Sequence, residues 1–385
     1  MNGRIKLGNR IIKKITEISL DEEGPFYLYD ADRIRQVCQT FVNIPYSPKS
    51  INFAMMANST SGFLKILKDS GLNIFVNSIL HLEKAISEGF RGENIVFAAS
   101  AMDNRAMLRV CSHNAVLILD SPGQLSRWNS LCPGKEIGIR CNIGDKVIPR
   151  KTHAGYFIGS ESRLGFDPGE IRVLAGNKQV IGLHVYVGTN ITDITYFLDC
   201  YRKIAELADL FPGLQFLDFG GGFGLGDNPS VFFDIASYGE KVSGLMIRLS
   251  EKIGRKIKLI LEPGRIIGGD AGYFICKVVD VKTKNNMQLI GVNASSAQFP
   301  RPLFYADSAY HPVNVIPANG KQPGLNALKT SVFGCSTYSR DFLARNIDLH
   351  PVNVDDLIVF GYAGAYCAAA YTNFLGFPPV KEIFF

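Results

Sequence analysis

Eight short apolar runs separated by helical patterns constrain the fold of this chain more than any other feature. The runs are rich in β-branched and aromatic residues and are apolar along their length, which is typical of strands buried in a parallel sheet. They span residues 51–57, 72–78, 94–100, 115–121, 137–143, 180–188, 214–220 and 258–265. Helical patterns between them span residues 61–69, 80–88, 101–111, 124–129, 191–209 and 232–253.

Eight consecutive strand–helix units predict a closed (β/α)8 TIM barrel rather than an open doubly wound sheet. The alternative, a Rossmann-like sheet, should carry G-x-G-x-x-G near its first strand, yet the glycine cluster of residues 220–224 and Gly226 follows the seventh. After about residue 270, β-rich runs broken by Asn, Gly and Pro predict a smaller antiparallel β-domain. We therefore expect a barrel over residues 26–270 and a β-domain from residues 1–25 and 271–385, which the segment 5–12 joins.

The amino-acid composition and charge limit the kinds of protein that this chain can be. The chain has 385 residues, of which 46% are hydrophobic and 20% charged, so it can bury a large core and is not generally disordered. The net charge of +6 comes from scattered basic residues, so we expect no nucleic-acid partner. The apolar runs are strand-sized and the first twenty residues lack an apolar stretch, which predicts no membrane partner and a cytoplasmic location. The eight cysteines show no zinc-site spacing, so we expect no metal.

Two adjacent predicted strands end in residues that resemble an anion site, where barrels of this type gather their functional groups. The seventh strand runs through Asp218 into Gly220–Gly222, whose backbone N–H groups can approach a phosphate because no Cβ intervenes. The eighth ends at Glu262, Gly264 and Arg265, and the arginine could complete a phosphate clamp. A simple tight turn and a structural salt bridge are the alternatives, but the position after strands seven and eight favours a phosphate.

An ordered set of motifs resembles the fold type III pyridoxal phosphate decarboxylases, the ornithine, diaminopimelate and arginine decarboxylase group with an alanine racemase-like barrel. The resemblance covers almost the whole chain. Its motifs are PFYLYD at 25–30, FAMMAN at 53–58, SRLGF at 162–166, GGGF at 220–223, EPGR at 262–265, GAY at 364–366 and FPP at 377–379. QFPRP at 298–302 and DFLA at 341–344 are similar to the branch that serves siderophore and antibiotic pathways.

The resemblance implies a carbon–carbon lyase that acts on an amino acid or an amino-acid conjugate, with pyridoxal 5′-phosphate (PLP) as cofactor and a homodimer that shares its active site. Gly220–Gly222 and Arg265 would hold the cofactor phosphate, and Tyr366 would touch it from the β-domain. Glu262 would face the pyridine nitrogen and favour the protonated ring, which is the electron sink for a carbanion. The matched motifs add a further set of cofactor-binding residues: Asn58, Tyr186, Thr189 and Gly264.

The chain departs from the family pattern at the covalent anchor. The Schiff-base lysine of the family falls on Met56, and a thioether cannot form an imine. The histidine that stacks on the cofactor ring falls on Tyr186, which can still stack because stacking needs only a flat ring. The serine that follows falls on Thr189, and an acidic pair falls on Phe75 and His81.

The proton donor of the family is also replaced. The cysteine that protonates the carbanion falls on Thr337, four residues before Asp341, and a hydroxyl is a far weaker acid than a thiol. Cys335 lies two residues away and could substitute only if the loop is rearranged. His184 shares a strand face with Tyr186 and is predicted to be a hydrogen-bonded core histidine.

Two explanations of Met56 stay open, an engineered Lys→Met change and natural divergence, and the other altered positions favour divergence. Two functions also stay open. The chain is either a PLP-dependent amino-acid decarboxylase whose cofactor is bound non-covalently or lost, or a non-catalytic pseudoenzyme that binds a ligand or a partner on the decarboxylase scaffold.

Overall fold

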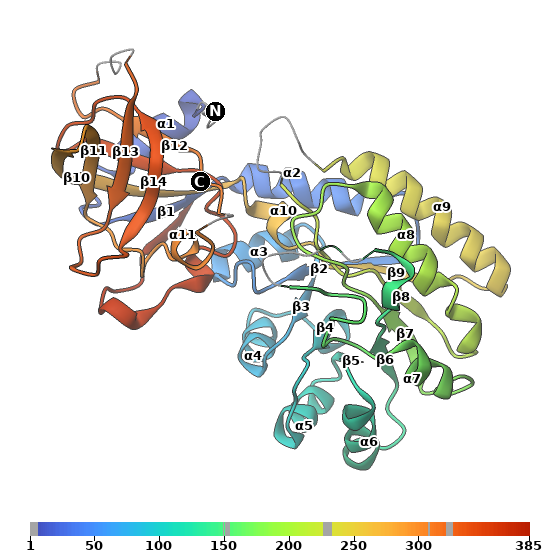
Figure 1. The fold of residues 1–385 in the computed structure, drawn as a ribbon. Coiled ribbons are helices and arrows are strands. Elements are labelled where there is room, and N and C mark those ends of the chain that lie inside the picture. The colour runs from blue at the N-terminus through green and yellow to red at the C-terminus, as the bar shows by residue number, and fades with distance from the viewer. Residues whose placement is uncertain (1–6, 149, 151–154, 226–232, 307–308, 321–325) are drawn as a thin grey trace. The chain divides into compact units, whose positions relative to one another are not determined.

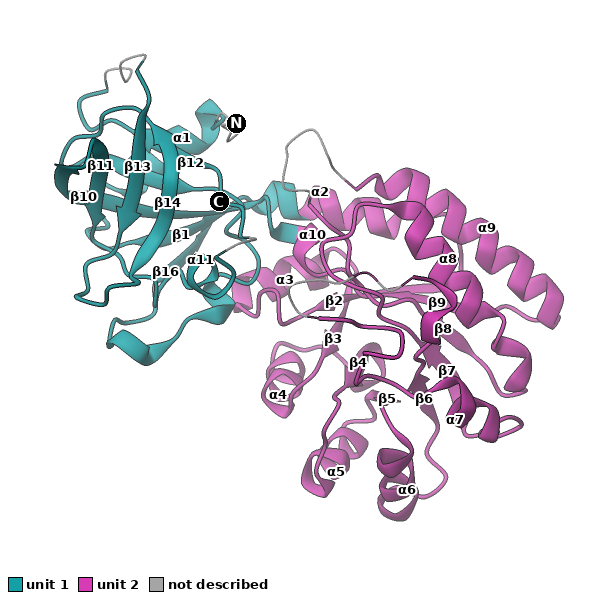
Figure 2. Ribbon diagram, in the orientation of Figure 1, with its two compact units in different colours: residues 1–34, 227–230, 268–385 teal, residues 35–226, 231–267 magenta. Residues whose placement is uncertain are grey.

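The computed structural model describes residues 7–148, 150, 155–225, 233–306, 309–320 and 326–385. Three parts of the predicted elements lie outside these residues: residues 5–6, Gly226 and Phe232. The chain divides into two units, each described by itself below (Figures 1 and 2). One unit comprises residues 35–226 and 231–267, and the other residues 1–34, 227–230 and 268–385.

The first unit is a closed barrel of eight parallel strands in which neighbours in the chain are neighbours in space (Figure 1). Each predicted apolar run contains or overlaps one of these strands, so the predicted barrel is confirmed. The strands are β2 (Lys49–Ala54), β3 (Asn73–Val76), β4 (Ile95–Ala98), β5 (Val116–Leu119), β6 (Ile137–Arg140), β7 (Val180–His184), β8 (Phe216–Asp218) and β9 (Lys258–Leu261).

Helices follow most barrel strands and begin at residues that suit helix starts. The side chains of Ser78, Asp103, Ser121 and Asp234 each accept a backbone N–H of the helix that follows, which satisfies a donor without an intrahelical partner. The helices are α2 (Ala31–Val42), α3 (Ser61–Asp69), α4 (Ile79–Ser87), α5 (Asn104–Ser112), α6 (Pro122–Leu131), α7 (Pro168–Val173), α8 (Ile194–Ala205), α9 (Ile235–Ile253) and α10 (Arg265–Gly268). None of the helices described in either unit is both long enough and apolar enough to cross a membrane.

The barrel interior is filled by side chains rather than open. Phe216 lies in a buried cluster with Phe75 and Ile118, and Met56 packs against this cluster from the end of β2. Gly182 leaves room for the ring of Phe216, because a Cβ there would lie 1.9 Å from it. The site at the C-terminal ends of the strands therefore has an apolar floor.

Among its described residues, the second unit has a mixed sheet of eight strands and two short α-helices. The main order is β12–β15–β10–β11–β13–β14, and β1 joins β10 and β16. The elements are α1 (Asn9–Ile18), β1 (Phe26–Tyr29), β10 (Gly272–Lys284), β11 (Met287–Val292), α11 (Arg301–Phe304), β12 (Val313–Ile316), β13 (Leu328–Phe333), β14 (Phe342–Leu349), β15 (Leu357–Phe360) and β16 (Lys381–Phe384).

Two details of this unit differ from the prediction, and a third adds to it. The sheet is not purely antiparallel, because β11 pairs with β13, and β1 with β16, in parallel. The barrel does not begin near Phe26, since β1 pairs with β10 of this sheet and β2 is the first barrel strand. The described part of the segment 5–12 leads into a helix, α1, which buries Ile15 in the same cluster as Phe26 and Leu28. Its isoleucines follow helical spacing, which places them on one face.

Candidate active site

The C-terminal ends of β6, β7, β8 and β9 bring four ionisable side chains together inside the barrel. Arg140 is the direct neighbour of His184, and His184 is the direct neighbour of Asp218. Asp218 pairs with Ile260, and Glu262 lies two residues further on the same strand face because strand side chains alternate. His184, Asp218 and Glu262 are at most 4% exposed.

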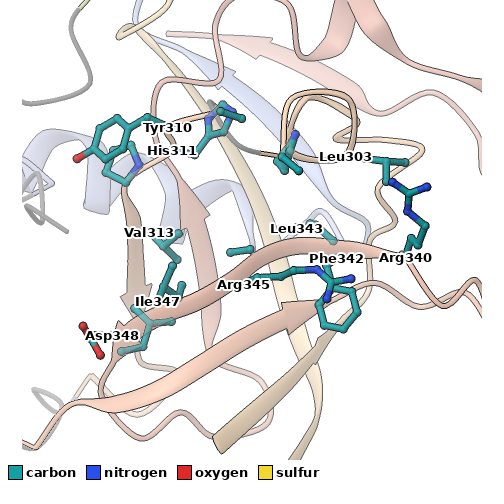
Figure 3. Close-up of a pocket in the computed structure, with 16 residues that line it drawn as sticks. Leu303, Tyr310, His311, Val313, Arg340, Phe342, Leu343, Arg345, Ile347 and Asp348 are labelled. Atoms are coloured by element: carbon teal, nitrogen blue, oxygen red, sulfur yellow. The ribbon is translucent and has the colours of Figure 1, made fainter. Parts of the chain in front are cut away.

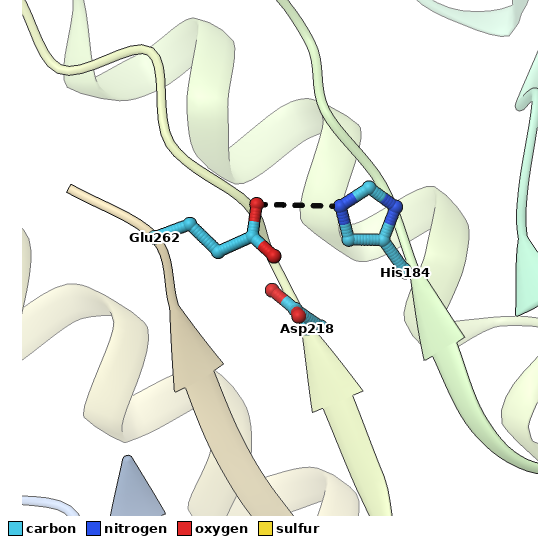
Figure 4. Close-up of side chains that lie close together, drawn as sticks. All are labelled: His184, Asp218 and Glu262. Carbon is cyan, nitrogen blue, oxygen red and sulfur yellow. Dashed lines mark ion pairs between the residues drawn. The ribbon is translucent and has the colours of Figure 1, made fainter. Parts of the chain in front are cut away.

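The histidine and the two carboxyl groups lie within reach of one another, as Figure 4 shows. Nε2 of His184 is 3.5 Å from Oε2 of Glu262. Within the described residues, neither ring nitrogen of His184 has a hydrogen-bond partner, nor do Oδ2 of Asp218 and Oε1 of Glu262. The other Asp218 oxygen, Oδ1, accepts the backbone N–H of Gly220 at 2.9 Å. His184 is thus buried as expected, but the predicted hydrogen bond is wrong.

Burial sets the protonation of this cluster. It lowers the pKa of His184 to about 4, so the ring is neutral at pH 7. Burial also raises the pKa of Glu262 to about 8, and burial together with the neighbouring Glu262 raises the pKa of Asp218 well above its usual range. Two adjacent buried carboxyl groups cannot easily both ionise. The cluster therefore keeps protons that surface carboxyl groups would lose.

The same three side chains place potential metal ligands within 4.8 Å of one another. The sequence predicted no metal, and the structure adds a reason against a cation here. The buried guanidinium of Arg140 acts electrostatically on Glu262 and already supplies a positive charge.

The glycine turn after β8 is required by close packing of backbone on backbone. A Cβ on Gly221 would lie 2.2 Å from the carbonyl oxygen of Glu262, and one on Gly220 would lie 2.6 Å from that of Val185. Gly220 and Gly222 also adopt positive φ angles of 63° and 99°. Glycine was predicted here so that a phosphate could approach the backbone, and close backbone packing is a second reason for it. The N–H groups of Gly221 and Gly222 find no acceptor among the described residues and can bind an anion.

Tyr186 presents its ring beside this turn. Its Cδ2 would lie 3.3 Å from a Cβ on Gly220. Phe157 packs edge-on against the ring at 4.8 Å between centroids, and the guanidinium carbon of Arg140 lies 5.9 Å from its centroid. Thr189 is half-buried in the loop that follows. The position predicted to stack on a cofactor therefore holds a supported aromatic ring at the barrel mouth.

The residues that follow β2 are held by the barrel and by the next helix. Met56 is half-buried against the apolar floor. Asn58 is buried, and its Oδ1 accepts the backbone N–H of Thr60 at 3.0 Å and the Thr60 hydroxyl at 2.7 Å. After β9, which neighbours β2, Gly264 is buried and Arg265 begins α10. The structure thus gathers the predicted barrel residues on the ends of β2, β7, β8 and β9.

Asp341, the aspartate of the motif that the resemblance assigns to the catalytic proton donor, lies in the other unit and organises its own loop. It is 2% exposed, and its carboxylate accepts the N–H groups of Ser296 at 2.6 Å and Ser336 at 3.1 Å. The Ser336 hydroxyl adds a bond of 2.5 Å and the Ser295 hydroxyl one of 3.3 Å. Because these donors occupy the carboxylate, Asp341 serves here to position the loop. Thr337 is exposed on that loop.

Two more predicted site residues lie in the second unit. Cys335 is exposed, and partial burial and the charge of Asp341 raise the pKa of its thiol, so it remains protonated at neutral pH. Tyr366 adopts a φ of 57°, which is rare for a residue with a side chain. Gly364 before it has no room for a Cβ, which would lie 1.8 Å from the carbonyl oxygen of Gly268.

Comparison with known proteins decides the family. The model of the family described as "Pyridoxal-dependent decarboxylase, pyridoxal binding domain" matches residues 31–269, more than half of the chain. The chain belongs to this decarboxylase family. PLP is the cofactor of the family, so the predicted family and cofactor are confirmed.

Several relatives match over nearly the full length. The diaminopimelate decarboxylase of Buchnera aphidicola is 26% identical over 391 residues, covering 96% of this chain and 91% of the relative. That of Methanothermobacter thermautotrophicus is 27% identical over 382 residues, with 94% and 87% covered. The crystal structure of diaminopimelate decarboxylase from Helicobacter pylori complexed with L-lysine has a TM-score of 0.85 at 24% identity, covering 96% of this chain and 94% of that one. This structural similarity supports the fold described above.

Sequence reasoning missed the buried acid cluster as a unit. Asp218 was seen only as the start of the glycine turn, and His184 was assigned to the core. Each is the last residue of a buried apolar strand, as is Arg140. An ionisable residue at that point of several neighbouring barrel strands is a signal that could have identified the cluster.

Proposed function

We propose that this chain binds PLP at the mouth of its barrel without the covalent lysine link of its family. The proposal rests on one combination of features at the barrel mouth. Met56 follows β2, the glycine turn follows β8, and the buried Glu262 follows β9. The residues fit the phosphate and the ring of the cofactor, but they do not fit its covalent anchor.

The phosphate end would be bound by the backbone. The N–H groups of Gly221 and Gly222 point to no acceptor among the described residues, and consecutive N–H groups of this kind form anion-binding concavities. Arg265 follows β9, next to this turn, and its guanidinium can bind two phosphate oxygens at once.

The ring end would be bound by Glu262 and Tyr186. Glu262 would hold a proton at the ring nitrogen, and Tyr186 would cover one ring face. When bound, the cofactor supplies an electron sink for negative charge at the α-carbon of an amino acid. Asn58, Thr189 and the buried Gly264 would complete the walls of the site.

Met56 changes how the ligand is retained. A thioether has no nucleophilic nitrogen, so PLP would be held only by reversible contacts. The nearest lysine in sequence, Lys49, is the first residue of β2, at the end of the strand away from Met56. The next two, Lys65 and Lys68, lie on α3, where the Nζ of Lys68 donates to the carbonyl oxygen of Glu88. We therefore propose a PLP-binding member of the decarboxylase family that does not decarboxylate amino acids by the covalent route.

A second candidate function is decarboxylation of an amino acid or an amino-acid conjugate. Family membership supports it, and so does the protonated thiol of Cys335 two residues from Thr337. The relatives include diaminopimelate decarboxylases and a lysine/ornithine decarboxylase complexed with cadaverine, so a basic or dicarboxylic amino acid is the substrate class to test.

Absorbance titration with PLP separates these proposals when the natural chain is compared with Met56→Lys and with Met56→Leu as a control. We expect reversible binding by the natural chain and by Met56→Leu, and a covalent chromophore only in Met56→Lys. Carbon dioxide release from diaminopimelate, L-lysine and L-ornithine is measured in parallel. Steady release by the natural chain would overturn the non-catalytic proposal, and absence of PLP binding by all three proteins would overturn the cofactor proposal.

Two further proposals rest on the resemblance alone. One is a homodimer that shares its active site, which light scattering of the purified chain would test by its mass. The other is membership of the siderophore and antibiotic branch, based on the motifs at 298–302 and 341–344. A chain that remains monomeric at the concentrations used for PLP binding would contradict the shared site.

A further inference from the structure

The carboxyl groups of Asp218 and Glu262 form an acid pair in the barrel. Their side chains come from neighbouring strands and face each other in Figure 4. Asp218 is completely buried and Glu262 is 4% exposed. Oδ2 of Asp218 and Oε1 of Glu262 receive no hydrogen bond from any described residue, although both are strong acceptors. Two acceptors in contact without a donor are costly unless a proton lies between them.

The groups that face the pair do not supply enough positive charge to ionise both acids. Arg140 on β6 has a side chain that is 14% exposed, and its Nε already lies 4.0 Å from Oδ1 of Asp120 on β5. His184 on β7 is neutral and offers at most one N–H toward Glu262. The other titratable groups that interact with Asp218 or Arg140 are Arg163, Tyr186, Tyr201, Tyr238 and Lys258.

Full ionisation would therefore leave three carboxylates around one buried guanidinium. Lys258, a cation that interacts with Asp218, is the first residue of β9, at the opposite end of that strand from Glu262. Tyr238 donates its hydroxyl to Tyr201 rather than to the acids. Two like charges within 4.8 Å of each other repel strongly in a buried site. One retained proton removes this repulsion.

We infer that Asp218 and Glu262 share a single proton at neutral pH, which makes Asp218 the positioning residue that keeps the ring-facing carboxyl protonated. The raised pKa values of both groups agree with this geometry. The shared proton does not depend on a bound cofactor. The role of this proton in cofactor binding does rest on the proposed function. Glu262 would pass the proton to the ring nitrogen, and the positive charge of the ring would then compensate the negative charge of the second carboxylate.

Infrared spectroscopy of the ligand-free chain tests the inference, because the carbonyl stretch of a protonated carboxyl group is separate from the bands of ionised carboxylates. The chain is treated with a chelator and measured at pH 7. We expect one buried carboxyl band that is absent from both Asp218→Asn and Glu262→Gln. Asp341→Asn is the matched control: its carboxylate accepts four internal hydrogen bonds, so this variant should keep the band.

A band that persists in both Asp218→Asn and Glu262→Gln, or no band in the natural chain, would overturn the inference. A band that appears only after chelation would overturn it in favour of a bound cation. If a variant does not fold, the natural chain still provides the test, since its band should disappear as the pH rises well above about 8. Because no PLP is present, failure here is distinguishable from failure of the proposed function.

Discussion

Replacing Glu262 with glutamine should change how the stability of the chain depends on pH. The pKa of Glu262 is about 8 in the folded chain, against an ordinary value of 4.5. Between these values the folded carboxyl keeps a proton that the unfolded chain has lost. Unfolding therefore releases a proton, and the free energy of unfolding falls as pH rises, by up to ~1.4 kcal/mol per pH unit.

His184 has the opposite effect in a different window. Its pKa is about 4 in the folded chain and 6.5 ordinarily, so between these pH values the ring is protonated in the unfolded chain and neutral in the folded chain. Stability then rises with pH between about 4 and 6.5. The two effects cancel over most of that window. From pH 6.5 to 8 His184 no longer offsets the loss due to Glu262, which amounts to about 2 kcal/mol.

Urea unfolding followed by the fluorescence of Trp128 measures this difference, because the single tryptophan of the chain is buried in the barrel unit. The natural chain should lose about 2 kcal/mol more than Glu262→Gln between pH 6.5 and 8. Glu240→Gln, which removes an exposed carboxyl group from α9, is the control and should follow the natural chain. Parallel pH profiles of the natural chain and Glu262→Gln would refute the reasoning.

Two other substitutions test the site from different sides. Gly221→Ala would bring a Cβ to 2.2 Å from the carbonyl oxygen of Glu262, so we expect PLP affinity to fall at least about tenfold in a fluorescence titration. Unchanged affinity would show that the turn does not bind the phosphate. Asp341→Ala leaves four internal donors without their acceptor, so we expect about 3 kcal/mol lower stability and faster reaction of Cys335 with a thiol reagent. A normal reaction rate with normal stability would contradict the positioning role of Asp341.

The barrel could be predicted because its strands are apolar along their whole length and regularly spaced. The same property misled the prediction at residues 26–29, where β1 is also buried at every position. Its partner β10 begins at Gly272, and nothing local in the sequence shows a pairing over such a separation. The helix α7 was missed because it has only six residues, too few for a helical pattern to emerge.

The site could be predicted as far as its motifs reach. The glycine turn and Glu262 were identified from sequence motifs in the order typical of the family. The structure adds the reason for the glycines, because neighbouring backbone atoms occupy the space that a Cβ would need. The role of Asp218 follows from complete burial beside a second acid, which no spacing in the sequence reveals. For Asp341 the motif gave the position, but only the structure shows that its carboxylate accepts four internal hydrogen bonds.

The most direct test of the central claim is peptide mass spectrometry after borohydride reduction of the chain loaded with one equivalent of PLP. The account predicts that the natural chain retains PLP in equilibrium dialysis but carries no reduced adduct at any single lysine. Met56→Lys should carry the adduct at residue 56. A natural chain labelled stoichiometrically at one lysine would contradict non-covalent binding, and a natural chain that retains no PLP would contradict the site itself.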